Sequence, residues 1–319
     1  MINEIIKEIK ASKTFLITAH VGIEGDALGS ELATYGLLKR LKKTAVIFND
    51  DYTPATYRFL PFHQKVHHDL KRRKFDVAMV LDCSDSSRAG AVKDYLVNAG
   101  RIINIDHHIS NTAFGDLNWI DPKASSACQM VYVLCERLGV MDKNIASCIY
   151  TGIFTDTGNF TYSSVTPETH RIVSELLRYK IDPQIIHHHL NSMCSKGDLL
   201  SIGKIVSALR FDTTHKICWA VIDSWKEKDY DLTEVLFSIM RFSKDTEVFL
   251  LFKQIGTQKI RINLRSRFFV DVNKIAQHFG GGGHKRASGA TVADSLIHTE
   301  KKVVSFVRRY IDGLPAGAK

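Results

Sequence analysis

An aspartate and two histidines, Asp106, His107 and His108, follow a short, mostly apolar run over 102–105 of this 319-residue chain. The run predicts a buried strand, and the carboxyl ends of strands in α/β proteins open into the crevice where ligands bind. Imidazole and carboxylate groups at such a place can bind a metal ion or transfer a proton. A polar loop that merely contains two histidines is the alternative, and other segments must decide between the two.

A second group of ligand-type side chains lies in an early loop. His20, Glu24 and Asp26 fall between a strand predicted over 14–18 and a helix predicted by leucines at helical spacing from Leu28 onward. One imidazole and two carboxylates suit Mn²⁺, Fe²⁺, Co²⁺ or Mg²⁺. Asp26 could instead be a helix N-cap, so this group alone leaves both interpretations open.

Two single aspartates occupy comparable positions. Asp82 ends a strand predicted over 75–81, where its carboxylate could bridge two metal ions, and Asp156 is expected just past a helix end. Arg88 could bind a phosphate oxygen or pair with Asp85. Four separate elements therefore deliver ligand-type side chains, which favours a site over a coincidence.

Strands alternate with helices over residues 1–185, which predicts a mostly parallel α/β domain. A linker helix is expected over 186–210, and a smaller α/β domain over 211–319. The net charge of +9 lies almost entirely after residue 200, where 20 basic side chains accompany 12 acidic ones. The second domain is expected to bind an anionic partner, and a solvated basic surface is the alternative.

The second domain contains four consecutive glycines followed by three basic residues. Consecutive glycines let main-chain N–H groups approach an anion, and the basic side chains add positive charge. A flexible linker would seldom place such charge beside the glycines. We predict a phosphate-binding segment that comprises Gly282, Gly283, His284, Lys285 and Arg286.

The composition, 45% hydrophobic and 24% charged, is that of a globular protein. No run approaches the roughly 20 apolar residues that span a bilayer, so we expect a cytoplasmic protein with no membrane partner. The six cysteines form no CxxC pair, which argues for reduced thiols and against a zinc ribbon or a disulfide framework.

These motifs resemble the DHH phosphoesterase superfamily. The resemblance rests on HxxxExD from His20, the lone Asp82 after a strand, DHH at 106–108 and TDTGNF at 155–160. In the second domain, GGGGHKRASG at 280–289, with RSR at 265–267, resembles the DHHA1 substrate-binding module, which implies that Arg265 and Arg267 also bind substrate. Together the two resemblances cover almost the whole chain, and its order and size are most similar to the oligoribonuclease/pAp phosphatase group.

The resemblance implies a site for two divalent cations, usually Mn²⁺, with Mg²⁺ and Co²⁺ as alternatives. One ion would be held by Asp26, Asp82, His107 and Asp156, and the other by His20, Glu24 and Asp82. Glu24 departs from the family, which usually has aspartate there. By the same resemblance, His108 would contact the substrate phosphate as a hydrogen-bond donor or acid, and Asp106 would orient the imidazoles.

The expected reaction is hydrolysis of a phosphoester by metal-activated water in a cleft between the domains. The expected substrates are short RNA oligonucleotides, or 3′-phosphoadenosine 5′-phosphate (pAp). Hydrolysis of linear or cyclic dinucleotides is an alternative. A non-catalytic nucleotide binder, with Glu24 marking a decayed metal site, is another. The sequence is compatible with a homodimer but does not determine the oligomeric state.

Overall fold

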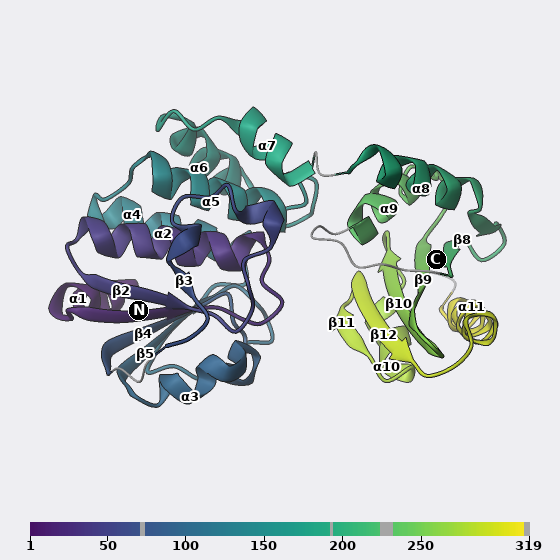
Figure 1. Cartoon of the computed structure of the whole chain (residues 1–319), viewed down its shortest axis with the longest axis horizontal. Coiled ribbons are helices and arrows are strands. Elements are labelled where there is room, and N and C mark those ends of the chain that lie inside the picture. Colours follow the sequence, from purple (N-terminus) through teal and green to yellow (C-terminus); the bar gives the residue numbers. More distant parts are fainter. Residues whose placement is uncertain (71–73, 192–193, 224–231, 316–319) are drawn as a thin grey trace. The chain divides into compact units, whose positions relative to one another are not determined.

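The computed structural model describes residues 1–70, 74–191, 194–223 and 232–315. The chain divides into two compact units, Met1–Met193 and Cys194–Lys319. Both are α/β units (Figure 1), as the sequence predicts.

A six-stranded sheet forms the centre of the first unit. The strand order is β3-β2-β1-β4-β5-β6, and every neighbouring pair is parallel. The strands predicted over 14–18 and 75–81 are confirmed, whereas the short edge strands β3 and β6 were not predicted. The strands are β1 (Thr14–Thr18), β2 (Thr44–Phe48), β3 (Val66–His67), β4 (Phe75–Leu81), β5 (Ala99–Asp106) and β6 (Leu117–Ile120).

Alternate residues of each central strand enter two different cores. In β1, Phe15 and Ile17 pack against one layer of helices, and Leu16 packs on the opposite face. Because both faces are covered, the strands read as nearly continuous apolar runs. The first layer contains α1 (Ile2–Ala11), α2 (Gly25–Arg40), α4 (Ala127–Leu138), α5 (Lys143–Asp156), α6 (Pro167–Leu177) and α7 (Pro183–Asn191). The other face carries η3 (Ser86–Val92) and α3 (Lys93–Leu96) (Figure 1).

Glycines allow α2 and α5 to approach closely beside the sheet. A Cβ atom on Gly29 would lie 2.7 Å from the carbonyl oxygen of Cys148. A Cβ atom on Gly152 would lie 2.9 Å from Oδ1 of Asp26 and would overlap Cys128. The close crossing brings the first turn of α2 near α5, and each of these helices carries a predicted metal ligand.

We expect Gly152→Ala to destabilise the protein by about 1–3 kcal/mol, the range for overpacking a filled core. This loss should exceed the gain of about 1 kcal/mol that alanine gives over glycine in a helix. Gly203→Ala is the matched control, because Gly203 lies in α8 (Lys196–Ser207) with no atom within 4 Å of an added Cβ. Denaturant unfolding of both variants checks the prediction, and an unchanged or raised stability of Gly152→Ala would contradict it.

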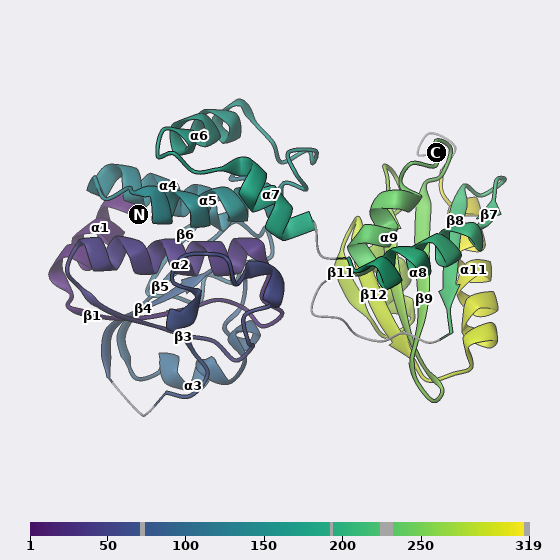
Figure 2. The same cartoon turned by 45° about the horizontal axis from the view of Figure 1, so that its top comes forward.

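The second unit is built on a mixed six-stranded sheet in the order β11-β12-β10-β9-β8-β7. Only β8 and β9 pair in parallel. Helices α8 and α9 cover one face, and α10 and α11 the other; Figure 2 shows α8, α9 and α11 beside the sheet. The bounds are β7 (Arg210–Asp212), β8 (Ile217–Ile222), α9 (Leu232–Met240), β9 (Val248–Gly256), β10 (Lys259–Ser266), α10 (Val272–His278), β11 (Gly282–His284), β12 (Ala287–Val292) and α11 (Leu296–Asp312).

The predicted linker segment, 186–210, contains the end of α7 and all of α8, and its residues 192 and 193 lie outside the described part. The predicted continuous linker helix is therefore not what the described residues form: α7 ends at Asn191, and α8 begins at Lys196. Within the described ranges, no helix has the length and apolar character that crossing a bilayer requires.

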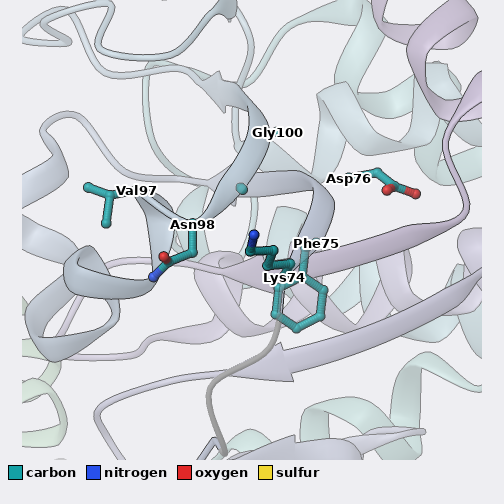
Figure 3. Close-up of a pocket in the computed structure, with 7 residues that line it drawn as sticks. Lys74, Phe75, Asp76, Val97, Asn98 and Gly100 are labelled. Atoms are coloured by element: carbon teal, nitrogen blue, oxygen red, sulfur yellow. The ribbon is translucent and has the colours of Figure 1, made fainter.

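A pocket lies at the amino ends of β4 and β5 (Figure 3). Its lining includes Phe75 and Asp76 from the start of β4 and Gly100 from the start of β5. Asp76 has a structural role there, because its Oδ2 accepts hydrogen bonds from the main-chain N–H groups of Lys13 and Thr14. Ligands of open parallel sheets bind at the carboxyl ends of the strands, so the pocket lies at the wrong end of the sheet for the predicted site.

Candidate metal centre

The predicted ligands gather at the carboxyl ends of β1, β4 and β5. His20 lies two residues after β1, Asp82 directly follows β4, and His107 directly follows β5. Because these strands are adjacent and parallel, their carboxyl ends meet at one edge. Two helix ends complete the site, since Asp26 lies in the first turn of α2 and Asp156 in the last turn of α5. Asp156 is thus the final residue of its helix and not, as predicted, the residue beyond it.

One cluster is centred on His107. Its Nε2 lies 3.4 Å from Oδ1 of Asp82, 3.7 Å from Oδ2 of Asp26 and 3.5 Å from Oδ2 of Asp156. Asp26, His107 and Asp156 can each direct one ligand atom at a common centre, because these atoms lie within 4.8 Å of one another. One imidazole and carboxylate oxygens form a donor set suited to a divalent cation.

A second cluster lies on the other side of Asp82. Nε2 of His20 is 3.5 Å from Oδ2 of Asp82 and 3.8 Å from Oε1 of Glu24. These three residues also form a group with ligand atoms within 4.8 Å. Asp82 therefore directs Oδ1 towards His107 and Oδ2 towards His20, as a carboxylate that bridges two cations would.

The buried polar atoms of this site fit a metal ion. Both carboxylate oxygens of Asp82 and Nε2 of His20 are buried and have no hydrogen-bond partner among the described residues. Buried polar atoms are normally satisfied, and a cation between these atoms would satisfy them. Asp82 also has a φ of 50°, a left-handed conformation that costs free energy in a residue other than glycine. The chain thus holds an unsatisfied carboxylate in a constrained backbone at the centre of the site.

The charges of the cluster perturb the pKa values of its members. Burial, followed by the charge of Asp82, raises the pKa of Asp26 to about 6. Burial disfavours charge on His107, but the carboxylates of Asp82, Asp26 and Asp156 outweigh it and raise the pKa of His107 to about 10. The carboxylates of Asp82 and Glu24 raise the pKa of His20 to about 10 in the same way. So many carboxylates in a buried space call for a positive charge, which protons or cations can supply.

Main-chain groups orient two of the ligands. Asp26 accepts hydrogen bonds from the N–H groups of Ala127 (2.6 Å) and Cys128 (2.8 Å) at the start of α4. Such N–H groups at a helix start favour a carboxylate. Nδ1 of His20 lies 2.7 Å from the carbonyl oxygen of Val21. A proton on Nδ1 would leave the lone pair of Nε2 directed at Asp82, as metal binding requires.

Asp106 organises the Asp-His-His segment from behind. Its carboxylate is fully buried and accepts hydrogen bonds from the His107 N–H (2.9 Å) and from Asn111 Nδ2 (2.6 Å). Its Oδ1 lies 2.7 Å from Nδ1 of His108. Burial disfavours charge on Asp106, but the contacts with His108 and Asn111 outweigh it and lower the pKa of Asp106. The supporting role predicted for Asp106 agrees with these contacts.

Sequence reasoning missed Asn111, which also donates to Asn104 (2.8 Å). An amide five residues after Asp106 gives no periodic signal, and only the folded loop brings it back onto the carboxylate.

A further buried acid, Glu31, was also missed. It lies within α2 and is fully buried. Its carboxylate accepts a hydrogen bond from Nδ2 of Asn49 (2.8 Å), the residue directly after β2. Burial raises the pKa of Glu31 to about 8. The sequence shows an acid within a largely apolar helix. Helical periodicity alone does not tell whether such an acid is buried or exposed.

The raised pKa of Glu31 predicts a loss of stability at alkaline pH. Between its ordinary pKa of 4.5 and about 8, the folded state holds a proton that the unfolded chain has released. Stability should therefore fall as pH rises through this window, by about 1.4 kcal/mol for each unit of pKa shift. We expect Glu31→Gln to raise the melting temperature relative to the wild type more at pH 9 than at pH 5, both measured in EDTA. Exposed Glu4→Gln is the control, and a difference independent of pH would contradict the prediction.

In the structure, the guanidinium of Arg88 binds Ser84, whereas the sequence suggests a phosphate oxygen or Asp85 as its partner. Its guanidinium lies 3.3 Å from Oγ of Ser84, whereas the carboxylate of Asp85 binds the N–H and hydroxyl groups of Ser87. The Arg88 carbonyl accepts the N–H of Val21 at 2.7 Å. Arg88 is therefore tied to the loop that carries His20, and phosphate binding by its side chain stays a prediction.

The glycine-rich segment of the second unit is an edge strand and a turn. Gly282, Gly283 and His284 form β11, which pairs with β12, and Gly283 has a φ of 142°, which favours glycine. His284 and Lys285 are exposed. The segment thus presents main chain and positive charge at the edge of the sheet, where an anion could approach.

The three arginines predicted to bind substrate are engaged within the protein. Arg265 forms an ion pair with Glu234, and Arg286 donates to the carbonyl of Val270 (3.0 Å). Arg267 donates to three main-chain carbonyls, with distances of 2.6 to 2.8 Å. These interactions give all three guanidinium groups a structural role, and substrate binding by them stays a prediction.

Comparisons with known proteins agree with the motifs. A model of the DHH family, N-terminal domain, matches residues 14–153, and a model of the DHHA1 domain matches residues 202–313. The chain is 33% identical over 313 residues to the bifunctional oligoribonuclease and PAP phosphatase NrnA of Thermus thermophilus. The matched region covers 97% of this chain and 93% of that protein. The NrnA of Bacillus subtilis is 25% identical over 307 residues, with coverages of 92% and 93%.

A solved structure has the same fold over nearly the full length. It is an exopolyphosphatase-related protein from Bacteroides fragilis, with a TM-score of 0.89 and 26% identity, covering 98% of this chain and 97% of that one. The resemblance inferred from the motifs is therefore confirmed. The chain belongs to the DHH phosphoesterase family and carries a DHHA1 domain.

Proposed function

We propose that this protein is a metal-dependent phosphoesterase that hydrolyses short RNA oligonucleotides to mononucleotides and pAp to AMP. Relatives named for these two activities match over more than nine-tenths of the chain. The observation that carries the proposal is Asp82, whose two buried oxygens lie between two ligand clusters without a hydrogen-bond partner among the described residues. A purely structural aspartate would be hydrogen-bonded or exposed.

Two divalent cations, with Mn²⁺ expected and Mg²⁺ or Co²⁺ as alternatives, would lower the pKa of a water molecule and offset charge on the phosphoryl oxygens. In the proposal, Asp82 serves both ions. The remaining ligands are Asp26, His107 and Asp156 for one ion, and His20 and Glu24 for the other.

His108 is proposed to act on the substrate through Nε2. Because Asp106 holds Nδ1 of this ring at 2.7 Å, a proton on Nδ1 would be shared with the carboxylate. Nε2 would then donate a hydrogen bond to a phosphoryl oxygen, or its proton to the leaving oxygen. In the second unit, the exposed His284 and Lys285 are proposed to contact the substrate's phosphate groups.

A substrate panel tests the proposed function. Purified protein with Mn²⁺, Mg²⁺ or Co²⁺ should release mononucleotides from labelled RNA of two to five nucleotides, and phosphate from pAp. Faster hydrolysis of a linear or cyclic dinucleotide messenger would favour the alternative enzyme. Nucleotide binding without turnover by metal-loaded protein would favour the non-catalytic binder. Elemental analysis of the same samples gives the number of bound ions, and light scattering gives the oligomeric state.

A further inference from the structure

Two phenylalanine rings in the second unit are exposed although neither belongs to the metal site. The exposed fraction is 86% for Phe242, which follows α9, and 70% for Phe268, which follows β10. Exposing two large apolar rings forgoes the stabilisation of about 25 cal/mol per Å² that their burial would give. The segments that carry the two rings are joined by hydrogen bonds from Arg267 to the carbonyls of Arg241 and Ser243, so the rings mark a candidate binding surface.

A single guanidinium group holds the two segments together. Nη2 of Arg267 donates to the carbonyls of Arg241 (2.6 Å) and Ser243 (2.8 Å), the residues on either side of Phe242. Phe268 is the residue after Arg267. The guanidinium also lies over the ring of Phe249, with Cζ 5.5 Å from its centroid. Arg267 therefore ties the segment that carries Phe242 to the segment that carries Phe268.

A buried carboxylate fixes the second segment independently. Glu247 is only 2% exposed, and its Oε1 accepts from the N–H groups of Phe268 (3.1 Å), Phe269 (2.7 Å) and Val270 (2.9 Å). Three main-chain donors on one carboxylate restrain the loop strongly. Phe268 is thus presented on an ordered backbone, which lowers the entropy cost of binding a partner.

Positive charge collects at the same end of the sheet. Strand register places Ser266 opposite Val248, and Arg265 opposite Ala287, so the starts of β9 and β12 lie beside the end of β10. The residues at this end therefore include both rings and several exposed polar groups. Its exposed cations are Lys216, Lys244 and Lys285, His284 is exposed beside them, and Asp245 is an exposed acid among them.

We infer that Phe242 and Phe268 form a stacking platform for the nucleobases of the oligonucleotide substrate. Aromatic rings bind bases through their π faces with little sequence preference, and neighbouring cations bind the phosphates. The mixture of exposed rings and cations fits a polyanion with flat apolar groups better than an apolar protein surface. This inference rests on the proposed function and adds how the second unit would hold the bases.

Fluorescence of 2-aminopurine tests the platform directly, because stacking quenches this base. RNA pentamers with 2-aminopurine at each position in turn are titrated with protein in EDTA, which prevents hydrolysis. Quenching is expected for the wild type and for Phe268→Trp, and it should be lost in Phe242→Leu and Phe268→Leu, which keep an apolar side chain. Phe211→Leu is the matched control, since Phe211 is 54% exposed on β7, an edge strand three positions from β10 in the sheet. Equal quenching by all variants would overturn the inference.

Steady-state kinetics separate this inference from the proposed function. With Mn²⁺, each leucine variant should raise KM for the pentamer about 30-fold, the middle of the range for losing one stacked base, with kcat unchanged. Hydrolysis of p-nitrophenyl phosphate, or of an abasic ribose-phosphate dimer, should be the same for all variants. Absence of turnover by wild-type protein on every substrate refutes the proposed function, whereas normal turnover with no change in KM refutes only the platform. A change of oligomeric state in the leucine variants, with KM unaltered, would identify the rings as a self-association surface and also refute it.

Discussion

Asp82→Asn is expected to abolish turnover, with a loss in kcat on the order of 10⁴-fold, the scale seen when a central catalytic group is removed. Asparagine has nearly the same shape as aspartate, but it carries no charge and offers only one oxygen. One carboxylate oxygen of Asp82 lies 3.4 Å from Nε2 of His107 and the other lies 3.5 Å from Nε2 of His20, so one substitution should weaken the binding of both cations. The loss in kcat should be the same for the RNA pentamer and for pAp, because the substitution affects metal binding and not the contacts with the nucleoside.

Metal binding by Asp82→Asn gives a readout apart from activity. Mn²⁺ at 1,000 times its Kd would stabilise the wild-type protein by about 4 kcal/mol, and this gain should be lost in the variant. Asp94→Asn is the matched control, because Asp94 is exposed in α3 on the side of the sheet opposite α2 and α5. A variant that still binds Mn²⁺ as tightly as the wild type would show that Asp82 is not a shared ligand.

The parallel sheet and the gathering of most candidate ligands at one edge of it were predictable because both depend on local signals. A strand buried on both faces is an apolar run in the sequence, and polar residues follow where the strand ends. Asp82 and His107 lie at that transition in β4 and β5. Parallel pairing then brings their strand ends together, which is why separate motifs could be assigned to one site before any distance was known.

The groups that support the ligands were not predictable in this way. Asn111 reaches Asp106 through a loop, and Asn49 reaches Glu31 from the end of a different strand. Such contacts depend on side-chain directions in three dimensions and leave no periodic pattern. The short strand β6 was missed because its four residues alternate too briefly to give a signal.

The glycine-rich segment illustrates a different limit. The sequence indicated conformational freedom next to positive charge, but it could not separate an open loop from a paired strand. In the structure, a Cβ on Gly283 would lie 2.6 Å from the carbonyl oxygen of Ala287. The close approach of two backbones is a sufficient reason for glycine at this position. Composition alone therefore could not show that the glycine serves anion binding.

The roles of the two adjacent histidines should separate in one further experiment. His108→Asn is expected to lower kcat by about 10²–10⁴-fold, the usual contribution of a general acid or base, and to leave Mn²⁺ binding nearly unchanged. The physical reason is that Asp106 holds Nδ1 of His108, the nitrogen nearest Asp82. In contrast, Nε2 of His107 faces three carboxylates.

His107→Asn is the matched comparison, because it makes the same change one residue earlier. It should lower both the Mn²⁺-induced rise in melting temperature and kcat, whereas His108→Asn should lower kcat alone. The pH profile adds a second distinction, since the loss of a proton-transferring group removes one limb of the rate profile, and the loss of a metal ligand does not. If His108→Asn weakens Mn²⁺ binding as much as His107→Asn does, both imidazoles are ligands. Nδ1 of His108 would then have to leave Asp106 for the cation, and the buried carboxylate would act as a support for a metal ligand instead of a support for an acid.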